Sequence, residues 1–532
     1  MMNKTQKYFF NALMLSVVAL LMRGISVVYN VYITEKVGAE GMGLLTLCGG
    51  IYGFGITLAT SGINMAVVRL VSSAMPDEEL SLASKKSEER VRKIMKNALC
   101  YCLFFGATSA FTLYISAENI ARYLLLDIRA SACLKLMSFS LLPISICSAL
   151  NGYFCAVRRV YKNVISQLCE QGFKIFIVTA LLLTIAPKGV EFACIAVVCG
   201  GALAEALGVV ISGALFLFDR KIHYRKLVKN VRNVSDFDDF DTRIVPIALP
   251  VAISAYVRSA LSTIEHLLIP WGFRKNGASS VNALASYGVL HGMVIPLLLF
   301  PSAILGAFSS LLVPELSSAL AMKDEKRIKR IVSRVFDTTL LFALGVSGIF
   351  ICFSEEIGIF MYGSALASHY IRLLAPLIPL MYLDGAVDSM LKGLGYQLYT
   401  MRVNIVDSVI SVALIIILLP AFGINGLVAV IFITELVNTS FSILKLLEVA
   451  RVQTPIGKWI IKPICAIVFS TCISRLIFNI PFFISISGKA LIVLEVTVTA
   501  VIYLIISCAI GSLSKNDISF YKRVFCRKKS KK

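Results

Sequence analysis

Two arginines lie inside long apolar segments of this 532-residue chain. Arg23 stands within NALMLSVVALLMRGISVVYNVYI, and Arg258 stands within PVAISAYVRSALSTIEHLLIP. A charged side chain near the centre of a bilayer costs about 2.5–3.5 kcal/mol on insertion scales, so such residues usually face a polar cavity or a partner. Guanidinium groups donate paired hydrogen bonds to phosphate and stay charged. The two arginines, one at the head of each half, predict a central cavity that binds an anionic headgroup, and Arg69 is a further candidate.

Several carboxylates also lie within apolar segments. Glu265 follows Arg258 by seven residues on roughly one helical face, so a salt bridge between them, or snorkelling of the arginine, is the alternative to anion binding. Asp384 and Asp388 are one turn apart. Buried carboxylates bind Na⁺ or take up protons, so Glu265, Asp384 and Asp388 are candidates for ion coupling, with pairing between helices as the alternative. The remaining intramembrane acids are Glu170, which has Lys174 one turn later, Glu205, Asp407 and Glu435.

No grouping of residues indicates catalysis or a resident metal. The cysteines lie mostly inside apolar segments, and their spacing matches neither a disulfide framework nor a zinc site. The sequence contains no nucleotide-binding loop and no nucleophile with a partnered base. We therefore expect a protein that is not an enzyme, with no catalytic residue, no metal and no cofactor other than Na⁺ or H⁺ as a coupling ion.

The composition is that of a polytopic membrane protein. Hydrophobic residues make up 58% of the chain and charged residues 16%, whereas soluble domains have about 45–50% and about 25%. Because a helix needs about 20 apolar residues to cross the hydrocarbon, we expect about fourteen transmembrane helices. Their predicted ranges are 9–33, 42–74, 97–117, 132–156, 165–186, 190–218, 244–271, 284–313, 333–354, 369–395, 403–420, 425–448, 460–480 and 489–511.

The positive charge indicates the topology. The net charge is +21, and most lysines and arginines fall in the tails and in alternate loops, which marks those parts as cytoplasmic. Both termini are therefore predicted in the cytoplasm, and the basic tail against anionic headgroups rather than nucleic acid. Residues 83–97 and 118–130 are amphipathic, and we expect either interfacial helices or polar loops there.

A weak internal repeat divides the chain. The segment ending ALNGYFCAVRRVYKN matches the segment ending MLKGLGYQLYTMRVN, so that Gly152 aligns with Gly393. Repeats separated by six spans have the same orientation, which predicts two parallel six-helix lobes around a cavity. The predicted parts are an N-terminal lobe (1–218), a cytoplasmic linker (219–243), a C-terminal lobe (244–450), and two extra helices with a basic tail (451–532).

Glycines and prolines are candidates for packing and bending. Gly288 and Gly292 form a small-residue pair on one predicted helix, as do Gly49 and Gly53 on another, and such pairs allow close helix packing. Pro296 and Pro301 remove backbone hydrogen bonds and can bend the first of these helices. Bending suits alternating access, and static kinks required by packing are the alternative.

Three stretches resemble a known family. LNGYFCAVRRVYKNVISQLCEQGFKI (150–175), SYGVLHGMVIPLLLFPSAILGAFSSLLVPELSSA (286–319) and RGISVVYNVYITEKVGAEGMGLLTL (23–47) are similar to sequences of the stage V sporulation protein B and polysaccharide biosynthesis flippases. That family belongs to the multidrug/oligosaccharidyl-lipid/polysaccharide exporter superfamily. The resemblance implies a V-shaped, two-lobed all-α membrane protein with alternating access. It also implies a lipid-linked glycan substrate carried on a phosphate or pyrophosphate, and Arg23 lies in the helix where a related lipid II flippase uses cavity arginines.

The expected function is movement of an undecaprenyl-type lipid-linked oligosaccharide or peptidoglycan precursor across the bacterial plasma membrane, in spore cortex or other cell-wall polysaccharide synthesis. The expected partners are that substrate, membrane lipids and the enzymes of glycan synthesis. A cation-coupled multidrug exporter of the same fold is the first alternative, because Glu265, Asp384 and Asp388 would suit cationic drugs. A membrane scaffold that recruits glycan-assembly enzymes is the second.

Overall fold

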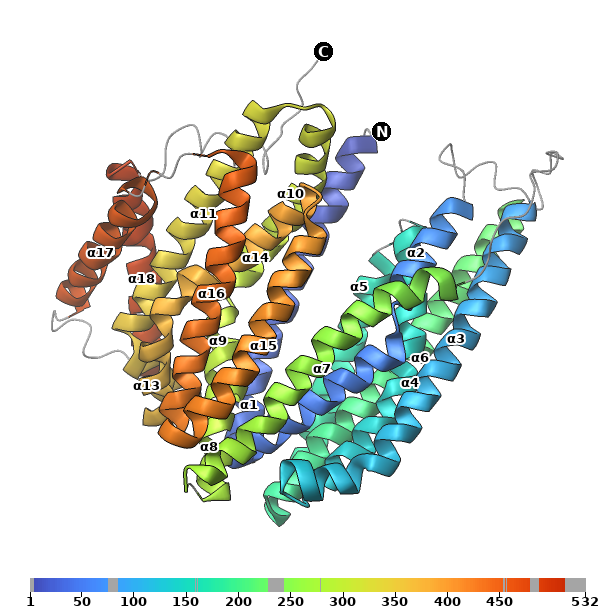
Figure 1. The fold of residues 1–532 in the computed structure, drawn as a ribbon, viewed down its shortest axis with the longest axis horizontal. Coiled ribbons are helices and arrows are strands. Elements are labelled where there is room, and N and C mark those ends of the chain that lie inside the picture. The colour runs from blue at the N-terminus through green and yellow to red at the C-terminus, as the bar shows by residue number, and fades with distance from the viewer. Residues whose placement is uncertain are drawn as a thin grey trace. The chain divides into compact units, whose positions relative to one another are not determined.

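The computed structural model describes residues 4–74, 85–157, 159, 161–227, 244–277, 279–452, 455, 457–478 and 488–511. These residues form helices, with no β-strand among them (Figure 1). This confirms the predicted all-α membrane class, because a helix satisfies all its backbone hydrogen bonds internally, as lipid requires. The predicted linker 219–243 lies partly outside this set. Residues 83–84 and the basic tail after residue 511 lie wholly outside it.

Twelve helices in the described part are long and apolar enough to cross a membrane. They differ from the predicted spans at two places. The predicted span 42–74 and the second part of the predicted span 9–33 fall within one stretch, Leu21–Ala74, and the predicted span 244–271 is not among the twelve. The number fourteen therefore stays a prediction.

The chain clusters into two compact units. Unit 1 contains Met1–Met22, Val28–Gly288 and Ser408–Leu427, and unit 2 contains Arg23–Val27, Val289–Asp407 and Val428–Lys532. Unit 1 thus includes the two helices around 244–288 that the sequence analysis placed in the second lobe. The predicted linker also begins later than expected, since residues 219–227 are the end of a helix.

Unit 1 is a bundle in which α4 packs against α2, α3 and α6, while α5 packs against α6 (Figure 1). Its core includes Ile63, Val67 and Ile94, none of which is exposed to solvent. Ile94 belongs to the predicted interfacial stretch 83–97, whose described part is the beginning of the long helix α3. The helices are α1 (Lys4–Thr60), α2 (Ile63–Ala74), α3 (Lys85–Asn119), η1 (Ile120–Leu125), α4 (Ala130–Ala156), α5 (Tyr161–Ile185), η2 (Ala186–Lys188), α6 (Val190–Leu227), α7 (Val245–Lys275) and α8 (Ser280–Tyr287).

Unit 2 is built around α11 and α14, which pack against each other and against α10 and α17. Its helices are η3 (Gly288–Val294), α9 (Ile295–Leu299), α10 (Ser302–Ala321), α11 (Glu325–Cys352), α12 (Ser354–Tyr362), α13 (Ala365–Leu374), η4 (Ala375–Leu377), α14 (Ile378–Gly393), η5 (Gly457–Ile461), α17 (Lys462–Phe478) and α18 (Gly488–Ala509). Two more helices, α15 (Gln397–Phe422) and α16 (Ile424–Ala450), each contribute residues to both units.

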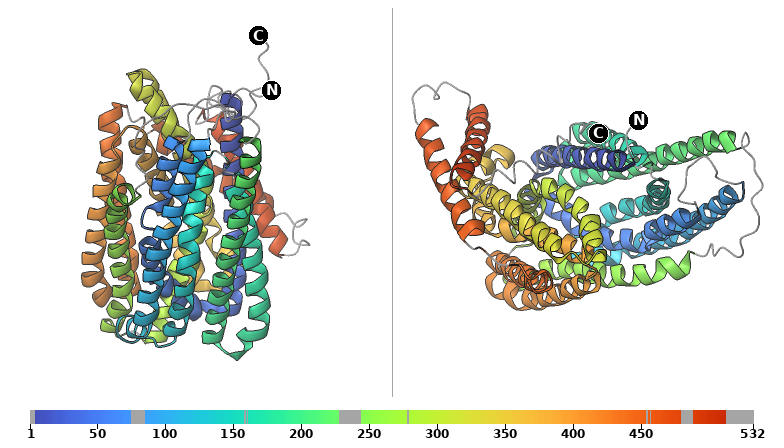
Figure 2. Two further views of the ribbon diagram at one scale, coloured as in Figure 1. Left: turned by 90° about the vertical axis from the view of Figure 1, so that its right-hand side faces the viewer. Right: turned by 90° about the horizontal axis from the view of Figure 1, so that it is seen from above.

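The pair α17 and α18 lies beside α11 (Figure 2). Asp337 of α11 accepts hydrogen bonds from Lys458 Nζ and Trp459 Nε1, both at 2.5 Å. The ring of Trp459 stacks on Phe336 with centroids 4.8 Å apart, and the hydroxyl of Tyr503 donates to the Leu341 carbonyl at 2.7 Å. These contacts fix the two C-terminal helices to unit 2.

One residue interrupts the first helix. Gly38 has φ 76° and ψ 173° inside α1, which is otherwise continuous from Lys4 to Thr60. Glycine reaches positive φ without the steric cost that a Cβ brings. The predicted loop between the first two spans is therefore a kink at a single residue.

The two glycines of the predicted repeat occupy similar packing positions. A Cβ at Gly152 would lie 2.8 Å from the carbonyl oxygen of Asn64, and one at Gly393 would lie 3.1 Å from that of Val313. Gly152 lies in the last two turns of α4 and Gly393 is the last residue of α14, and each faces the backbone of another helix of its own unit. The internal repeat itself stays a prediction.

Candidate functional site

The three candidate arginines are exposed and lie on three helices. Arg23 is on α1 within unit 2, Arg69 is on α2 and Arg258 is on α7, the last two within unit 1. None of the three forms an ion pair with another described residue. Arg23 lies near Tyr382 of α14, and its neighbour Gly24 lies beside Phe300, with a Cβ position 3.7 Å from the ring.

The expected alternative partner of Arg258 is engaged elsewhere. Glu265 lies on the same helix, α7, but its Oε1 accepts a hydrogen bond from the Ser411 hydroxyl of α15 at 2.5 Å. A bare guanidinium facing lipid would be costly, so an exposed arginine without a counter-ion indicates a polar surface or an anionic ligand. Among the described residues, Glu265 therefore forms no salt bridge with Arg258, and anion binding by Arg258 stays a prediction.

Unit 1 contains a polar group built from four helices. The Tyr52 hydroxyl of α1 donates to Glu205 Oε2 of α6 at 3.0 Å. Ser140 of α4 also interacts with both side chains. Lys174 of α5 lies within electrostatic range of both Glu205 and Glu170, so it partly neutralises the two carboxylates.

A second polar group follows the contact between α1 and α7. The Thr57 hydroxyl donates to Ser259 Oγ at 3.1 Å, and the Thr263 hydroxyl donates to the Gly50 carbonyl at 3.2 Å. His266 Nδ1 and the Tyr287 hydroxyl are 2.7 Å apart, with Tyr287 almost fully buried. These bonds join helices that are far apart in the sequence.

Unit 2 gathers three carboxylates from α14, α15 and α16. Glu435 lies within electrostatic range of Asp384 and Asp407, and its Oε1 accepts a hydrogen bond from Thr439 at 3.2 Å. Asn438 Nδ2 donates to Asp384 Oδ1 at 3.3 Å. The Asn438 side-chain oxygen is buried and accepts no hydrogen bond from the described residues.

Asp388 does not join this group. Its Oδ2 lies 3.5 Å from Lys392 Nζ, one turn later on the same helix. The one-turn spacing of Asp384 and Asp388 therefore did not identify the carboxylates that meet; the partners of Asp384 come from neighbouring helices. Among the described residues, no group of three or more His, Cys, Asp or Glu side chains is arranged to hold a metal ion.

The predicted helix 284–313 is divided into four pieces. Gly288 and Gly292 lie in the π-helical segment η3, Pro296 is the second residue of α9, and Pro301 precedes α10. A Cβ at Gly288 would lie 2.2 Å from the Ala39 carbonyl oxygen. Proline cannot donate the backbone hydrogen bond that a continuous helix needs, which accounts for the two later breaks.

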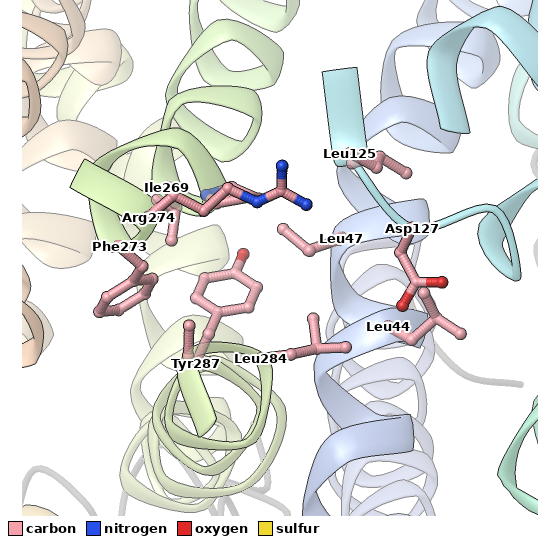
Figure 3. Close-up of a pocket in the computed structure, with 11 residues that line it drawn as sticks. Leu44, Leu47, Leu125, Asp127, Ile269, Phe273, Arg274, Leu284 and Tyr287 are labelled. Carbon is pink, nitrogen blue, oxygen red and sulfur yellow. The ribbon is translucent and has the colours of Figure 1, made fainter. Parts of the chain in front are cut away.

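A small pocket lies at one end of unit 1, between α1, η1, α7 and α8 (Figure 3). Its walls are mostly apolar, with Leu44, Leu47 and Phe273 among them. Arg274, Asp127 and Tyr287 supply the polar groups. Sequence reasoning did not single out Arg274, because its position at the end of a predicted span is typical of an ordinary headgroup contact.

Comparison with known families identifies the chain. The model of the polysaccharide biosynthesis protein family matches residues 10–320. The chain belongs to the polysaccharide biosynthesis protein family. The MatE family model matches residues 276–417, in line with the predicted superfamily.

Two curated relatives and one solved structure align with most of the chain. It is 24% identical to stage V sporulation protein B of Bacillus subtilis (strain 168), over 79% of this chain and 80% of the relative. It is 23% identical to the lipid II flippase MurJ of the same organism, over 76% of each. A solved structure of lipid II flippase MurJ in an inward closed conformation aligns with TM-score 0.66 at 14% identity, covering 97% of this chain and 99% of that one. As a member of this family the chain is a multi-pass membrane protein with the expected superfamily fold.

Proposed function

We propose that this protein is a flippase that moves a lipid-linked oligosaccharide or peptidoglycan precursor across the plasma membrane by alternating access. The observation that carries the proposal is the presence in apolar helices of Arg23 and Arg258, two exposed arginines that form no ion pair with another described residue. Such a substrate has a bulky polar head, phosphate groups and an isoprenoid tail. Fixed guanidinium groups stabilise the phosphates while the head passes through the membrane.

The family relationship supports the substrate class. Its family description names polysaccharide biosynthesis, and one relative is a lipid II flippase. We propose that the protein acts without catalysis, and that both termini lie in the cytoplasm, as the distribution of Lys and Arg indicates. A role in spore cortex or cell-wall polysaccharide synthesis follows from the same relationship, with glycan-synthesis enzymes as neighbours.

We further propose that unit 2 takes up the coupling ion, and that this ion is H⁺ rather than Na⁺, since no described group of carboxylates is arranged to hold a metal ion. Asp384, Asp407 and Glu435 bring three carboxylates together, and the oxygen of Asn438 adds an acceptor. In unit 1 the carboxylates of Glu170 and Glu205 also lie close together, but the ammonium group of Lys174 already lies within electrostatic range of both. Glu265, which has a hydroxyl partner, is a second candidate for proton uptake.

The binding of lipid II to the purified protein tests the main proposal. We expect Arg23→Ala and Arg258→Ala each to weaken binding by about tenfold or more, because a charged hydrogen bond contributes about 1.5–3 kcal/mol. Arg122→Ala is the matched control, since Arg122 pairs with Glu118 on the surface. Wild-type binding in both variants would assign the arginines a structural role.

The MatE match favours one alternative, a cation-coupled multidrug exporter. Uptake of a cationic dye into vesicles distinguishes the two functions. Dye transport that is lost in Asp384→Asn, together with no binding of lipid-linked precursors, would favour the exporter. Precursor binding without dye transport would favour the flippase.

A further inference from the structure

An ionic network closes one end of unit 1. Arg129 donates from Nη2 to Asp127 Oδ2 at 2.6 Å and to Glu40 Oε1 at 2.8 Å. Its hydrogen bond to Asp127, and then the bond to Glu40, raise the pKa of Arg129 further above its usual value, so it stays charged. The network joins α1, just after the Gly38 kink, to the loop that precedes α4.

The same loop contains a strained residue. Leu126 ends η1 with φ 61° and ψ 24°, the left-handed conformation. For a residue with a Cβ this conformation is uncommon and unfavourable. The amide of Leu126 donates to the Ala121 carbonyl, and so does that of Asp127 at 3.1 Å. Tertiary contacts therefore hold the loop in a conformation that its own backbone disfavours.

Arg274 makes one of the tertiary contacts with this loop. Its Nη2 donates to the Leu126 carbonyl oxygen at 3.0 Å, and this bond joins the end of α7 to the loop. Figure 3 shows the Arg274 side chain extending over the pocket, with Asp127 on the opposite side. The Asp127 carboxylate is already engaged by Arg129. The exposed guanidinium of Arg274 thus binds a neutral carbonyl and keeps its charge available.

The helices α1 and α8 are in close contact beneath Arg274. Leu44 is 1% exposed and Tyr287 is also 1% exposed. Backbones meet directly beside them, since a Cβ at Gly43 would lie 2.1 Å from the Leu284 carbonyl oxygen. The bond from Arg274 to the loop lies at the same pocket as this contact.

We propose that Arg274 is an anion-operated latch. A hydrogen bond from a cation to an anionic acceptor is roughly twice as strong as one between neutral groups. A phosphate that reaches this end of unit 1 therefore takes the guanidinium from the Leu126 carbonyl. The released loop loses the contact that holds it in the left-handed conformation, and α7 and α8 separate from α1. This inference rests on the proposed function for the identity of the phosphate, the head of the lipid-linked substrate.

Reactivity of a buried position reports the latch. Leu44→Cys is labelled with a membrane-impermeant maleimide in vesicles of both orientations, and the labelled peptide is quantified by mass spectrometry so that the native cysteines stay in place. We expect Arg274→Gln to speed labelling at least about tenfold, the effect of losing one charged hydrogen bond. Lys275→Ala, the adjacent charge on the same helix end, is the matched control and should leave the rate unchanged.

Inorganic pyrophosphate tests the anion response. It should speed labelling of the Leu44→Cys protein, and also of its combination with Arg274→Lys, which keeps the charge. It should have no effect when Arg274 is glutamine. Deuterium exchange at residues 118–130, measured without the cysteine substitution, should rise in Arg274→Gln as well.

Two results would overturn the latch. One is equal labelling and exchange in Arg274→Gln and the parent, and the other is a parent that does not respond to pyrophosphate. None of these measurements requires flipping. A pyrophosphate-responsive latch in a protein that neither binds nor moves lipid II would therefore refute the proposed substrate and leave the latch in place.

Discussion

Replacing Asp219 by asparagine should destabilise unit 1 strongly. Asp219 lies near the end of α6, and its side chain is 3% exposed. Its carboxylate accepts hydrogen bonds from Arg159 and Lys162, and from the Tyr153 hydroxyl at 3.1 Å. One carboxylate thereby joins the end of α4, the beginning of α5 and the end of α6.

The expected magnitude follows from the burial of the partners. The Lys162 side chain is only 11% exposed and that of Arg159 is 23% exposed. Asparagine has the shape of aspartate but no charge, so the substitution removes the carboxylate that both cations contact. Removing one partner of a buried ion pair costs about 3–5 kcal/mol, since an uncompensated charge remains.

Thermal unfolding of the detergent-solubilised protein measures this effect. Glu118→Gln is the matched control, because Glu118 pairs with Arg122 at side chains 52% and 60% exposed. Exposed pairs contribute about 0–1 kcal/mol, so this change should barely move the Tm. In Asp219→Asn the additional change Lys162→Met should recover part of the lost stability. Equal Tm values for Asp219→Asn and the control would refute the reasoning.

Three further predictions concern packing, backbone strain and the driving force. Gly288→Ala should lower the Tm, because overpacking costs about 1–3 kcal/mol. Gly49→Ala should raise the Tm slightly, because nothing lies within 4 Å of its Cβ position. Similar Tm shifts in both variants would contradict the contact of Gly288 with Ala39. Leu126→Gly should slow deuterium exchange at residues 118–130 relative to Leu126→Ala, because glycine removes about 1–2 kcal/mol of left-handed strain; faster exchange in the glycine variant would argue against that strain. Flipping of a pyrophosphate-linked substrate in proteoliposomes should accelerate under an imposed potential, since two charges crossing 100 mV gain about 4–5 kcal/mol, and a rate independent of potential would exclude this contribution.

Most of the architecture follows from properties local to the sequence. Long apolar runs must form helices in lipid, where every backbone polar group needs an internal partner. The spacing of these runs predicted most of the helices observed. The kink at Gly38 is the informative exception. Two helical segments meet at one glycine with a non-helical backbone, so the expected loop between two spans is reduced to a kink at Gly38.

The packing around the glycines depends on which other helix lies against them, and this could not be predicted from the sequence. Gly49 with Gly53 and Gly288 with Gly292 show the same small-residue spacing. In the structure, Gly288 lies against the backbone of α1, whereas Gly49 and Gly53 have nothing within 4 Å of their Cβ positions. Spacing defines a face of one helix, but another helix must approach that face for the small residue to matter.

The sequence by itself determined which helices carry charge in the membrane: arginines on α1 and α7, and carboxylates in both halves. It could not determine the partners. Glu265 shares a helical face with Arg258 yet accepts a hydrogen bond from Ser411. Asp384 accepts a hydrogen bond from Asn438 and lies within electrostatic range of Glu435, and it does not pair with Asp388. The spacing of residues along one helix determines only the face on which each side chain lies. A hydrogen bond needs two groups within about 3 Å of each other. Only the tertiary packing of helices distant in the sequence brings such groups together.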